Sequence, residues 1–238
     1  MTNLTLIALG LHVLGDYHLQ WPGLAKDKLE NRRAFVLHAL IYSALFALPA
    51  LLDHRVLPAM AAIAASHLII DLIKGIIPAP VRQRHEMPLY LADQTLHLLT
   101  LVLCCEYFFR TSSPPVFAAC NQNLIKWALL ALLITKPANI TLKLALSKYA
   151  PDPQTEAGKN REISGAGALI GSLERILTAI LLGLGQFAAI GLVFTAKSLA
   201  RFDRISKDQS FAEYYLIGSL SSLLWAFLCW LLLFHALK

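Results

Sequence analysis

Long apolar runs alternate with short polar connections along the chain. Each run is near or above the roughly 20 residues that a helix needs to cross a hydrocarbon layer about 30 Å thick. The runs are rich in Leu, Ala and Ile and lack the period-two alternation of membrane-barrel strands. The pattern predicts an all-α, polytopic transmembrane helical bundle of about six to seven spans with no β-sheet. The runs cover residues of about 3–20, 34–52, 56–77, 88–109, 124–147, 165–197 and 213–236.

Proline and glycine mark the connections between these runs, most clearly at 21–23, 78–80 and the Pro114-Pro115 pair. We expect a four-helix membrane domain over residues 1–112, followed by C-terminal membrane helices over 113–238. The run 165–197 is too short for two full crossings. A helix broken at 183–187, around Gly183 and Gly185, would still let the chain turn back there.

Lys and Arg are distributed unevenly among the connections. The first four connections carry four, one, three and one of these residues. Because cytoplasmic loops are the basic ones, we expect the first and third connections in the cytoplasm and the N-terminus outside. The first run has no basic segment before it and no small-residue cleavage site after it, which favours a retained helix over a signal peptide. In the second half, 148–163 and 197–210 are both basic, and the topology between them stays open.

Composition agrees with a membrane protein. Of the 238 residues, 57% are apolar and 15% are charged, with a mean hydropathy of +0.57. A soluble domain averages about 45–50% apolar and about 25% charged, and a disordered chain has fewer apolar residues still. The net charge of +6 lies in short clusters between apolar runs, so we expect membrane lipid and no nucleic acid as a partner. The four cysteines form no C-x-x-C pair and suggest neither a disulfide framework nor a thiolate zinc site.

Four consecutive spans each carry a polar pair at positions i and i+4. Residues four apart lie on one helix face, one turn from each other, where both can reach a common point. We counted the residues between each pair and the cytoplasmic end of its span. With antiparallel spans, all four pairs then lie in one layer, on the order of 8–10 Å inside the cytoplasmic boundary. The pairs are His12 with Asp16, His38 with Tyr42, His67 with Asp71, and Asp93 with His97.

This layer predicts a metal centre. A carboxylate near the middle of a membrane helix costs about 2.5–3.5 kcal/mol, and a divalent cation would offset that cost. Imidazole and carboxylate together suit zinc, manganese or iron, and we favour zinc, bound as one or two ions. His38 is a further ligand or a general acid/base, and Tyr42 orients substrate or stabilises charge. The predicted metal ligands are His12, Asp16, His67, Asp71, Asp93 and His97.

Structural interpretations stay open beside this hypothesis. A membrane histidine can simply hydrogen-bond a neighbouring helix, and a tyrosine such as Tyr42 is often a packing residue. Lys74 lies one turn after Asp71 and could be its ion-pair partner.

Basic residues near the layer are candidate substrate-binding groups. Arg32, Arg33 and Lys74 could bind an anionic amphiphile that approaches from the cytoplasmic leaflet. The positive-inside rule alone already requires arginines at these positions and is the preferred explanation of them. Arg175 lies within an apolar run and could bind a substrate phosphate or pair with another helix.

The ordered motifs of the first half resemble a known family. HVLGDYHLQ at 12–20, Lys28, HALIY at 38–42, HLIIDLIK at 67–74 and DQTLH at 93–97 are similar to the bacterial integral-membrane family catalogued as domain of unknown function 3307. The resemblance implies a multi-pass protein of the bacterial inner membrane and brings no activity with it. The H-x-x-x-D spacing of His67 and Asp71 also resembles membrane-bound metal-dependent hydrolases, whose paired His-Arg and Thr-His-Ser signature is missing here.

Three functions fit these residues. The first is a metal-dependent hydrolase that cleaves an ester or phosphoester of a lipid or other amphiphile with metal-activated water. The second is a cation- or proton-coupled transporter, and the third is a structural membrane protein without catalysis. The outer halves of the first four spans are nearly all apolar, which disfavours a complete polar conduit through them.

Overall fold

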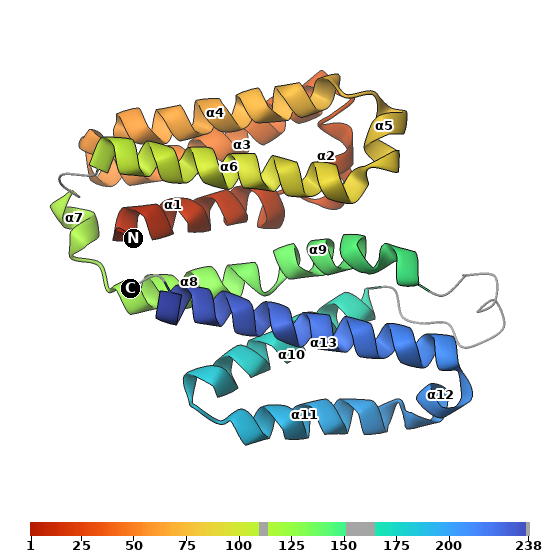
Figure 1. The fold of residues 1–238 in the computed structure, drawn as a ribbon. Helices are drawn as coiled ribbons and strands as arrows, with labels where there is room; N and C mark the ends of the chain where they lie inside the picture. Colours follow the sequence, from red (N-terminus) through yellow and green to blue (C-terminus); the bar gives the residue numbers. More distant parts are fainter. Residues whose placement is uncertain (110–113, 151–164, 237–238) are drawn as a thin grey trace. The chain divides into compact units, whose positions relative to one another are not determined.

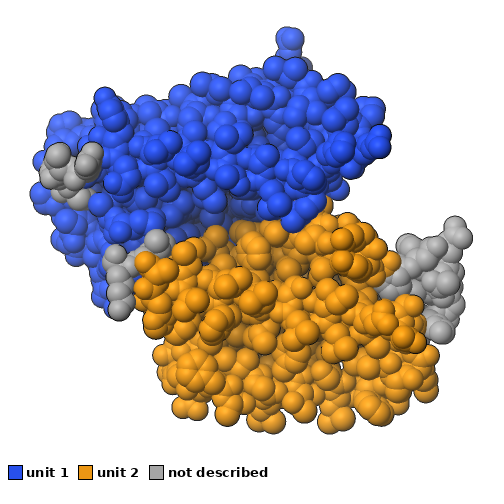
Figure 2. Space-filling view, in the orientation of Figure 1, with its two compact units in different colours: residues 1–132 blue, residues 133–238 orange. Residues whose placement is uncertain are grey.

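The computed structural model describes residues 1–109, 114–150 and 165–236. The described residues form helices and short connections, with no strand among them, which confirms the predicted all-α fold (Figure 1). The expected domain boundary at 112–113 and most of the basic connection 148–163 lie outside the described residues. By its internal contacts the chain forms two units, Met1–Leu132 and Leu133–Lys238 (Figure 2).

Unit 1 is a bundle of four helices with smaller elements at its ends (Figure 1). Within it, α4 packs against α3 and α6, and α1 packs against α3 and α6. Apolar side chains, including Leu4, Phe46 and Met60, fill one half of the bundle. The helical elements are α1 (Asn3–Val13), η1 (Leu14–His18), α2 (Pro22–Asp27), α3 (Arg32–Leu52), η2 (His54–Val56), α4 (Leu57–Ile76), α5 (Ala79–Arg84), α6 (Glu86–Phe109), α7 (Pro115–Ala118) and α8 (Gln122–Leu133).

Unit 2 contains α9 (Lys136–Leu146), η3 (Ser147–Tyr149), α10 (Ala166–Gly183), α11 (Phe187–Ala200), α12 (Phe202–Lys207), α13 (Gln209–Leu231) and η4 (Leu232–Ala236). A turn separates α10 from α11 where the sequence suggested a break, and the two helices run in opposite directions (Figure 1). Gly185 in this turn has a φ of 68°, a left-handed conformation that favours glycine. The run 165–197 is therefore a helical hairpin.

Six helices among the described residues are long and apolar enough to cross a membrane, within the predicted range of six to seven. The first predicted run, 3–20, is not among them, because its helix is short and ends in the π-helical turn η1. The outward faces are apolar; Leu51 is 80% exposed and Ile76 is 79% exposed. Since such large exposed apolar surfaces suit lipid and not water, the chain is a multi-pass membrane protein. The spans are Arg32–Leu52, His54–Ile76, Glu86–Phe109, Gln122–Tyr149, Ala166–Gly183 and Gln209–Ala236.

The span Gln122–Tyr149 contains a helix break between α8 and α9. The continuous apolar run 124–147 did not predict this break. Pro137 has no backbone N–H, so the carbonyl of Leu133 loses its partner within the helix. In its place, Trp225 Nε1 donates to that carbonyl at 3.1 Å, and Arg175 Nε donates to the next one, of Ile134. Side chains from α13 and α10 thus satisfy the break between α8 and α9.

Candidate metal centre

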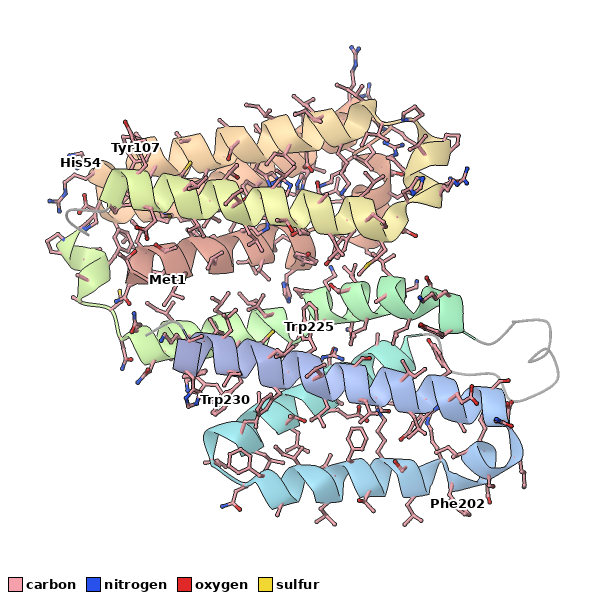
Figure 3. All side chains as sticks on the ribbon, in the orientation of Figure 1. Met1, His54, Tyr107, Phe202, Trp225 and Trp230 are labelled. Carbon is pink, nitrogen blue, oxygen red and sulfur yellow. The ribbon has the colours of Figure 1, made fainter. Side chains whose placement is uncertain are left out.

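The four predicted polar pairs converge in one half of unit 1. All eight of these side chains are buried. Figure 3 shows the side chains of the unit, with His54 labelled at the end opposite α2 and α5. Along their helices, the cluster residues lie at the end of α1, on η1 and in the middle of α3, α4 and α6 or nearer the ends that adjoin α2 and α5, whereas His54 precedes α4 at its other end.

Three ligand atoms in this cluster form a nearly equilateral triangle. His38 Nε2 lies 3.1 Å from His67 Nε2 and 3.3 Å from Asp71 Oδ2. The third edge, from His67 Nε2 to Asp71 Oδ2, is 3.4 Å. With zinc–nitrogen bonds of about 2.0–2.1 Å, the ligand atoms of a tetrahedral zinc site lie about 3.3 Å apart. The three side chains are each 1% exposed, and their spacing matches one face of such a tetrahedron.

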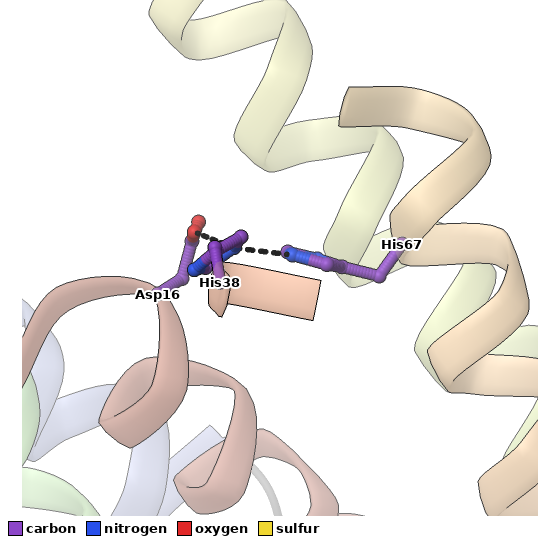
Figure 4. Close-up of side chains that lie close together, drawn as sticks. All are labelled: Asp16, His38 and His67. Carbon is purple, nitrogen blue, oxygen red and sulfur yellow. Dashed lines mark hydrogen bonds and ion pairs between the residues drawn. The ribbon is translucent and has the colours of Figure 1, made fainter. Parts of the chain in front are cut away.

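Asp16 stands beside this triangle, on the π-helical turn (Figure 4). Its Oδ1 lies 3.6 Å from His38 Nε2, and Asp16, His38 and His67 can place one ligand atom each within 4.8 Å of one another. Gln94 Nε2 donates to Asp16 Oδ2 at 2.8 Å. One carboxylate oxygen is therefore held by an amide while the other faces the triangle.

Gly15 explains how the turn approaches α3 so closely. A Cβ at this position would lie 3.0 Å from Tyr42 Cδ2 and 3.1 Å from Leu45 Cδ1. Only glycine fits here without displacing both side chains, and the close packing positions the carboxylate of the next residue, Asp16. Turns with this i to i+5 geometry are often found at functional sites.

His97 and Asp93 extend the cluster along α6. His67 Nδ1 lies 3.1 Å from His97 Nδ1, and His97 Nε2 lies 3.5 Å from Asp93 Oδ1. Lys74 Nζ donates to the other oxygen of Asp93 at 2.7 Å. His67, Asp71 and His97 form a second set that can place ligand atoms within 4.8 Å.

His12 and Tyr42 contact the centre from its apolar side. His12 Nδ1 lies 3.0 Å from the Tyr42 hydroxyl, and its Nε2 lies 3.3 Å from Gln94 Oε1. The Tyr42 ring stacks on the His67 ring, with centroids 3.6 Å apart and an interplanar angle of 5°. Both nitrogens of His12 thus face polar partners, and Tyr42 fixes the plane of the His67 ring.

Lys28 reaches into the same centre from the connection after α2. Its ammonium donates to Asp71 Oδ2 at 2.9 Å and to Asp16 Oδ1 at 3.4 Å, and it lies 3.3 Å from His38 Nε2. Burial by itself lowers the pKa of Lys28, but the neighbouring carboxylates outweigh it and the net pKa is raised. A cationic group therefore sits among the same atoms that would bind a metal ion.

The predicted substrate-binding residues have different positions. Arg32 and Arg33 are exposed at the start of α3. Lys74 pairs with Asp93, and the ion pair with Asp71 that the sequence suggested for it is made by Lys28 instead. Arg175 belongs to unit 2.

Two residues of the centre were not predicted as site residues. Lys28 lies in a connection, where its charge looked like an ordinary topology signal, and no helical period linked it to the polar layer. Gln94 follows Asp93 directly and so points about 100° away from it on an ideal helix, yet its long amide reaches Asp16. Both appear within the motifs of the family resemblance, which was the signal that could have marked them.

No curated protein and no solved structure matches the chain. One family model matches residues 4–125, which is just over half of the chain. The matched stretch includes every residue of the polar cluster, from His12 to His97. The chain belongs to the family described as protein of unknown function DUF3307.

Proposed function

We propose that this protein is a membrane-embedded, metal-dependent hydrolase that cleaves an ester or phosphoester of a lipid or other amphiphile. The observation that supports it is the triangle of His38 Nε2, His67 Nε2 and Asp71 Oδ2, with edges of 3.1–3.4 Å. Three protein ligands with a fourth position left for water is the usual arrangement of a catalytic zinc site. A transition metal held there lowers the pKa of its bound water towards 7 and supplies hydroxide for attack.

The imidazole pair favours one ion over two. A neutral imidazole carries one proton, so a ring that binds metal through Nε2 carries its proton on Nδ1. If His67 binds the ion, its Nδ1–H donates to His97 Nδ1, and the proton of His97 then lies on Nε2, facing Asp93 Oδ1. If both rings used Nε2 for metal, two N–H groups would meet at 3.1 Å. His97 and Asp93 therefore act as outer residues that orient His67, as carboxylates and carbonyls do at known metal sites.

The remaining residues have distinct roles in this proposal. Asp16 faces the fourth position and accepts the proton of the water there. Tyr42 holds the plane of His67 by stacking, and His12 and Gln94 hold Tyr42 and Asp16. An ion at the triangle would require Lys28 to leave the ligand atoms, and its ammonium would then stabilise the negative charge that develops on the substrate.

We place the centre in the cytoplasmic half of a bacterial inner membrane, with the N-terminus outside. The basic first and third connections support this orientation. Arg32 and Arg33 lie exposed on the same connection as Lys28, where they would meet an anionic headgroup.

A cation- or proton-coupled transporter is the second candidate. Lys28 favours it, because the ammonium pairs with both Asp16 and Asp71 and offsets one of their two negative charges, so such a centre has less need of a metal. In that case the Lys, His and Asp side chains would exchange protons or a monovalent cation.

Metal analysis of the full chain, purified in detergent without chelators, tests the proposal. We expect one zinc per wild-type chain and loss of that zinc in His38→Gln and Asp71→Asn. His54→Gln and Asp27→Asn change exposed residues outside the cluster and should keep the metal. Wild-type protein that binds no zinc after reconstitution, or centre variants that bind it fully, would contradict the metal site.

Turnover is tested on two probes in mixed micelles, bis-p-nitrophenyl phosphate and p-nitrophenyl decanoate. The hydrolase proposal expects one of them to be cleaved by wild type and by the His54→Gln control, and not by His38→Gln. Bound zinc without turnover of either probe, together with zinc-independent cation or proton flux in vesicles, would favour the transporter.

A further inference from the structure

Arg175 is a buried cation in a membrane-spanning helix of unit 2. It is 3% exposed. Its guanidinium donates to the carbonyl of Ile134 and to the side chains of Ser222, Asn139 and Ser172. All four acceptors are neutral. Hydrogen bonds to neutral groups use four of the five N–H donors and leave the positive charge uncompensated, which is costly at this depth.

The neighbouring charges do not remove this excess. Lys197 Nζ donates to Glu174 Oε2 at 2.6 Å, so these two residues form a pair of their own. Together Arg175, Lys197 and Glu174 carry a net charge of +1. An anion bound here would complete the charge balance.

These three residues line a small pocket between α10, α11 and α13. Its free volume is about 20 Å³, which is room for about one water-sized guest. Ile190, Val193 and Phe194 of α11 form an apolar wall on one side. The pocket is thus too small for a lipid headgroup or a nucleotide.

Two buried residues with hydroxyl side chains also line the pocket. Thr178 is 8% exposed and Ser219 is 4% exposed, and both line it. Serine and threonine in membrane helices ordinarily donate to the carbonyl four residues earlier, as Ser198 and Thr195 do here. Among the described residues, Thr178 and Ser219 make no such bond. One turn before Ser219, the buried hydroxyl of Tyr215 likewise has no partner among the described residues.

We propose that this pocket binds a single halide-sized anion, chloride in the cell, held by Arg175, Thr178 and Ser219. The guanidinium supplies the charge, and the hydroxyl groups supply donors that the protein otherwise leaves unused. Hydrogen bonds from N–H and O–H donors to an anion are charge-assisted, and they are stronger than bonds between neutral groups. The site is made of residues of unit 2 alone, and its chemistry does not depend on the metal proposed for unit 1.

Thermal unfolding of the full chain in lipid nanodiscs tests the site. Sodium chloride is exchanged for sodium gluconate at constant ionic strength, because gluconate is too large for the pocket. We expect the midpoint of wild-type unfolding to rise with chloride and to saturate. Sodium bromide should act like chloride, and sodium phosphate should act like gluconate.

Arg175 also supports the helix break at Ile134, so its loss would disturb folding. Variants that retain Arg175 therefore distinguish anion binding from folding. In Thr178→Val/Ser219→Ala we expect the chloride concentration for half-saturation to rise about tenfold for each hydroxyl group lost. A tenfold change is the size of effect expected when one hydrogen bond to a charged group is removed. Thr195→Val/Ser198→Ala removes the same atoms outside the pocket and should respond as wild type does.

A purely structural role predicts a different result. If Thr178 and Ser219 only support packing, their loss lowers the midpoint equally in chloride and in gluconate. That result would overturn the proposal, and so would a wild-type midpoint that is the same in both salts or that rises only with phosphate.

Discussion

His67 and His97 face each other through their Nδ1 atoms at 3.1 Å. The contact couples the tautomers of the two rings, because one nitrogen must donate and the other must accept. A single hydrogen bond thereby decides which of the two Nε2 atoms is free to bind metal. Because Asp93 lies on the far side of His97, its carboxylate belongs to the same series of contacts.

We expect Asp93→Asn to weaken zinc binding by about 10- to 100-fold without changing the stoichiometry of one zinc per chain. The amide no longer fixes the tautomer of His97, and through it that of His67, which is the usual cost of losing an outer carboxylate. Competition titration with a chromophoric chelator measures both quantities. Two zinc ions per wild-type chain would show that the imidazole pair opens and that His97 is a direct ligand.

Extended X-ray absorption of the zinc-loaded protein provides an independent count of ligands. We expect two imidazoles, from His38 and His67, in wild type and in His97→Gln. A third imidazole that disappears in His97→Gln would contradict the assignment of His97 as an outer residue.

Lys28→Met should tighten zinc binding by at least about tenfold. The variant keeps most of the side-chain volume but removes an ammonium that lies within 4 Å of the ligand atoms. Two unit positive charges about 4 Å apart repel each other by about 4 kcal/mol at an effective dielectric constant of about 20. Lys26→Met, at an exposed position two residues earlier at the end of α2, is the matched control. Tighter zinc binding combined with lost turnover of the micellar probes would support the dual role of Lys28; unchanged zinc affinity would show that the ammonium and the ion do not compete.

Gly15→Ala should destabilise unit 1 by about 1–3 kcal/mol, the usual cost of overpacking. The new methyl group would meet Tyr42 and Leu45 at 3.0–3.1 Å. Gly75→Ala has open space at its Cβ and should be neutral or stabilising, by up to about 1 kcal/mol. Reversible unfolding in mixed micelles compares the two, and equal effects would argue against a tight η1–α3 contact.

Trp225→Phe should cost about 1–3 kcal/mol, because it leaves the partly buried carbonyl of Leu133 without a donor. Trp230→Phe, on the same helix, makes no such bond to the α8–α9 break and should cost less. The same unfolding measurement serves here. If Pro137→Ala removes the effect of Trp225→Phe, the proline is the cause of the free carbonyl.

The sequence predicted the helices and the polar layer because both rest on short-range periodicity. The four i, i+4 pairs follow from helix geometry, and the lengths of the spans placed them at one level. Lys28 could not be predicted as a member of the centre, since a side chain that enters from a connection has no period. The break at Ile134 was missed for another reason: Pro137 gives a local signal, but the donors that make the break tolerable come from Arg175 and Trp225, far away in the chain.

Among the charged side chains of the centre, Lys74 is the most exposed, at 23%, while those of Lys28, Asp16 and Asp93 are each 6% exposed and that of Asp71 is 1% exposed. The Lys74–Asp93 pair thus forms the most exposed edge of the centre. Loading and loss of an ion should be slow events that wait for this edge to part, so occupancy in a cell would follow the history of metal supply and not its momentary level. If a metal binds in this centre, Lys74 would set its residence time more than its equilibrium affinity.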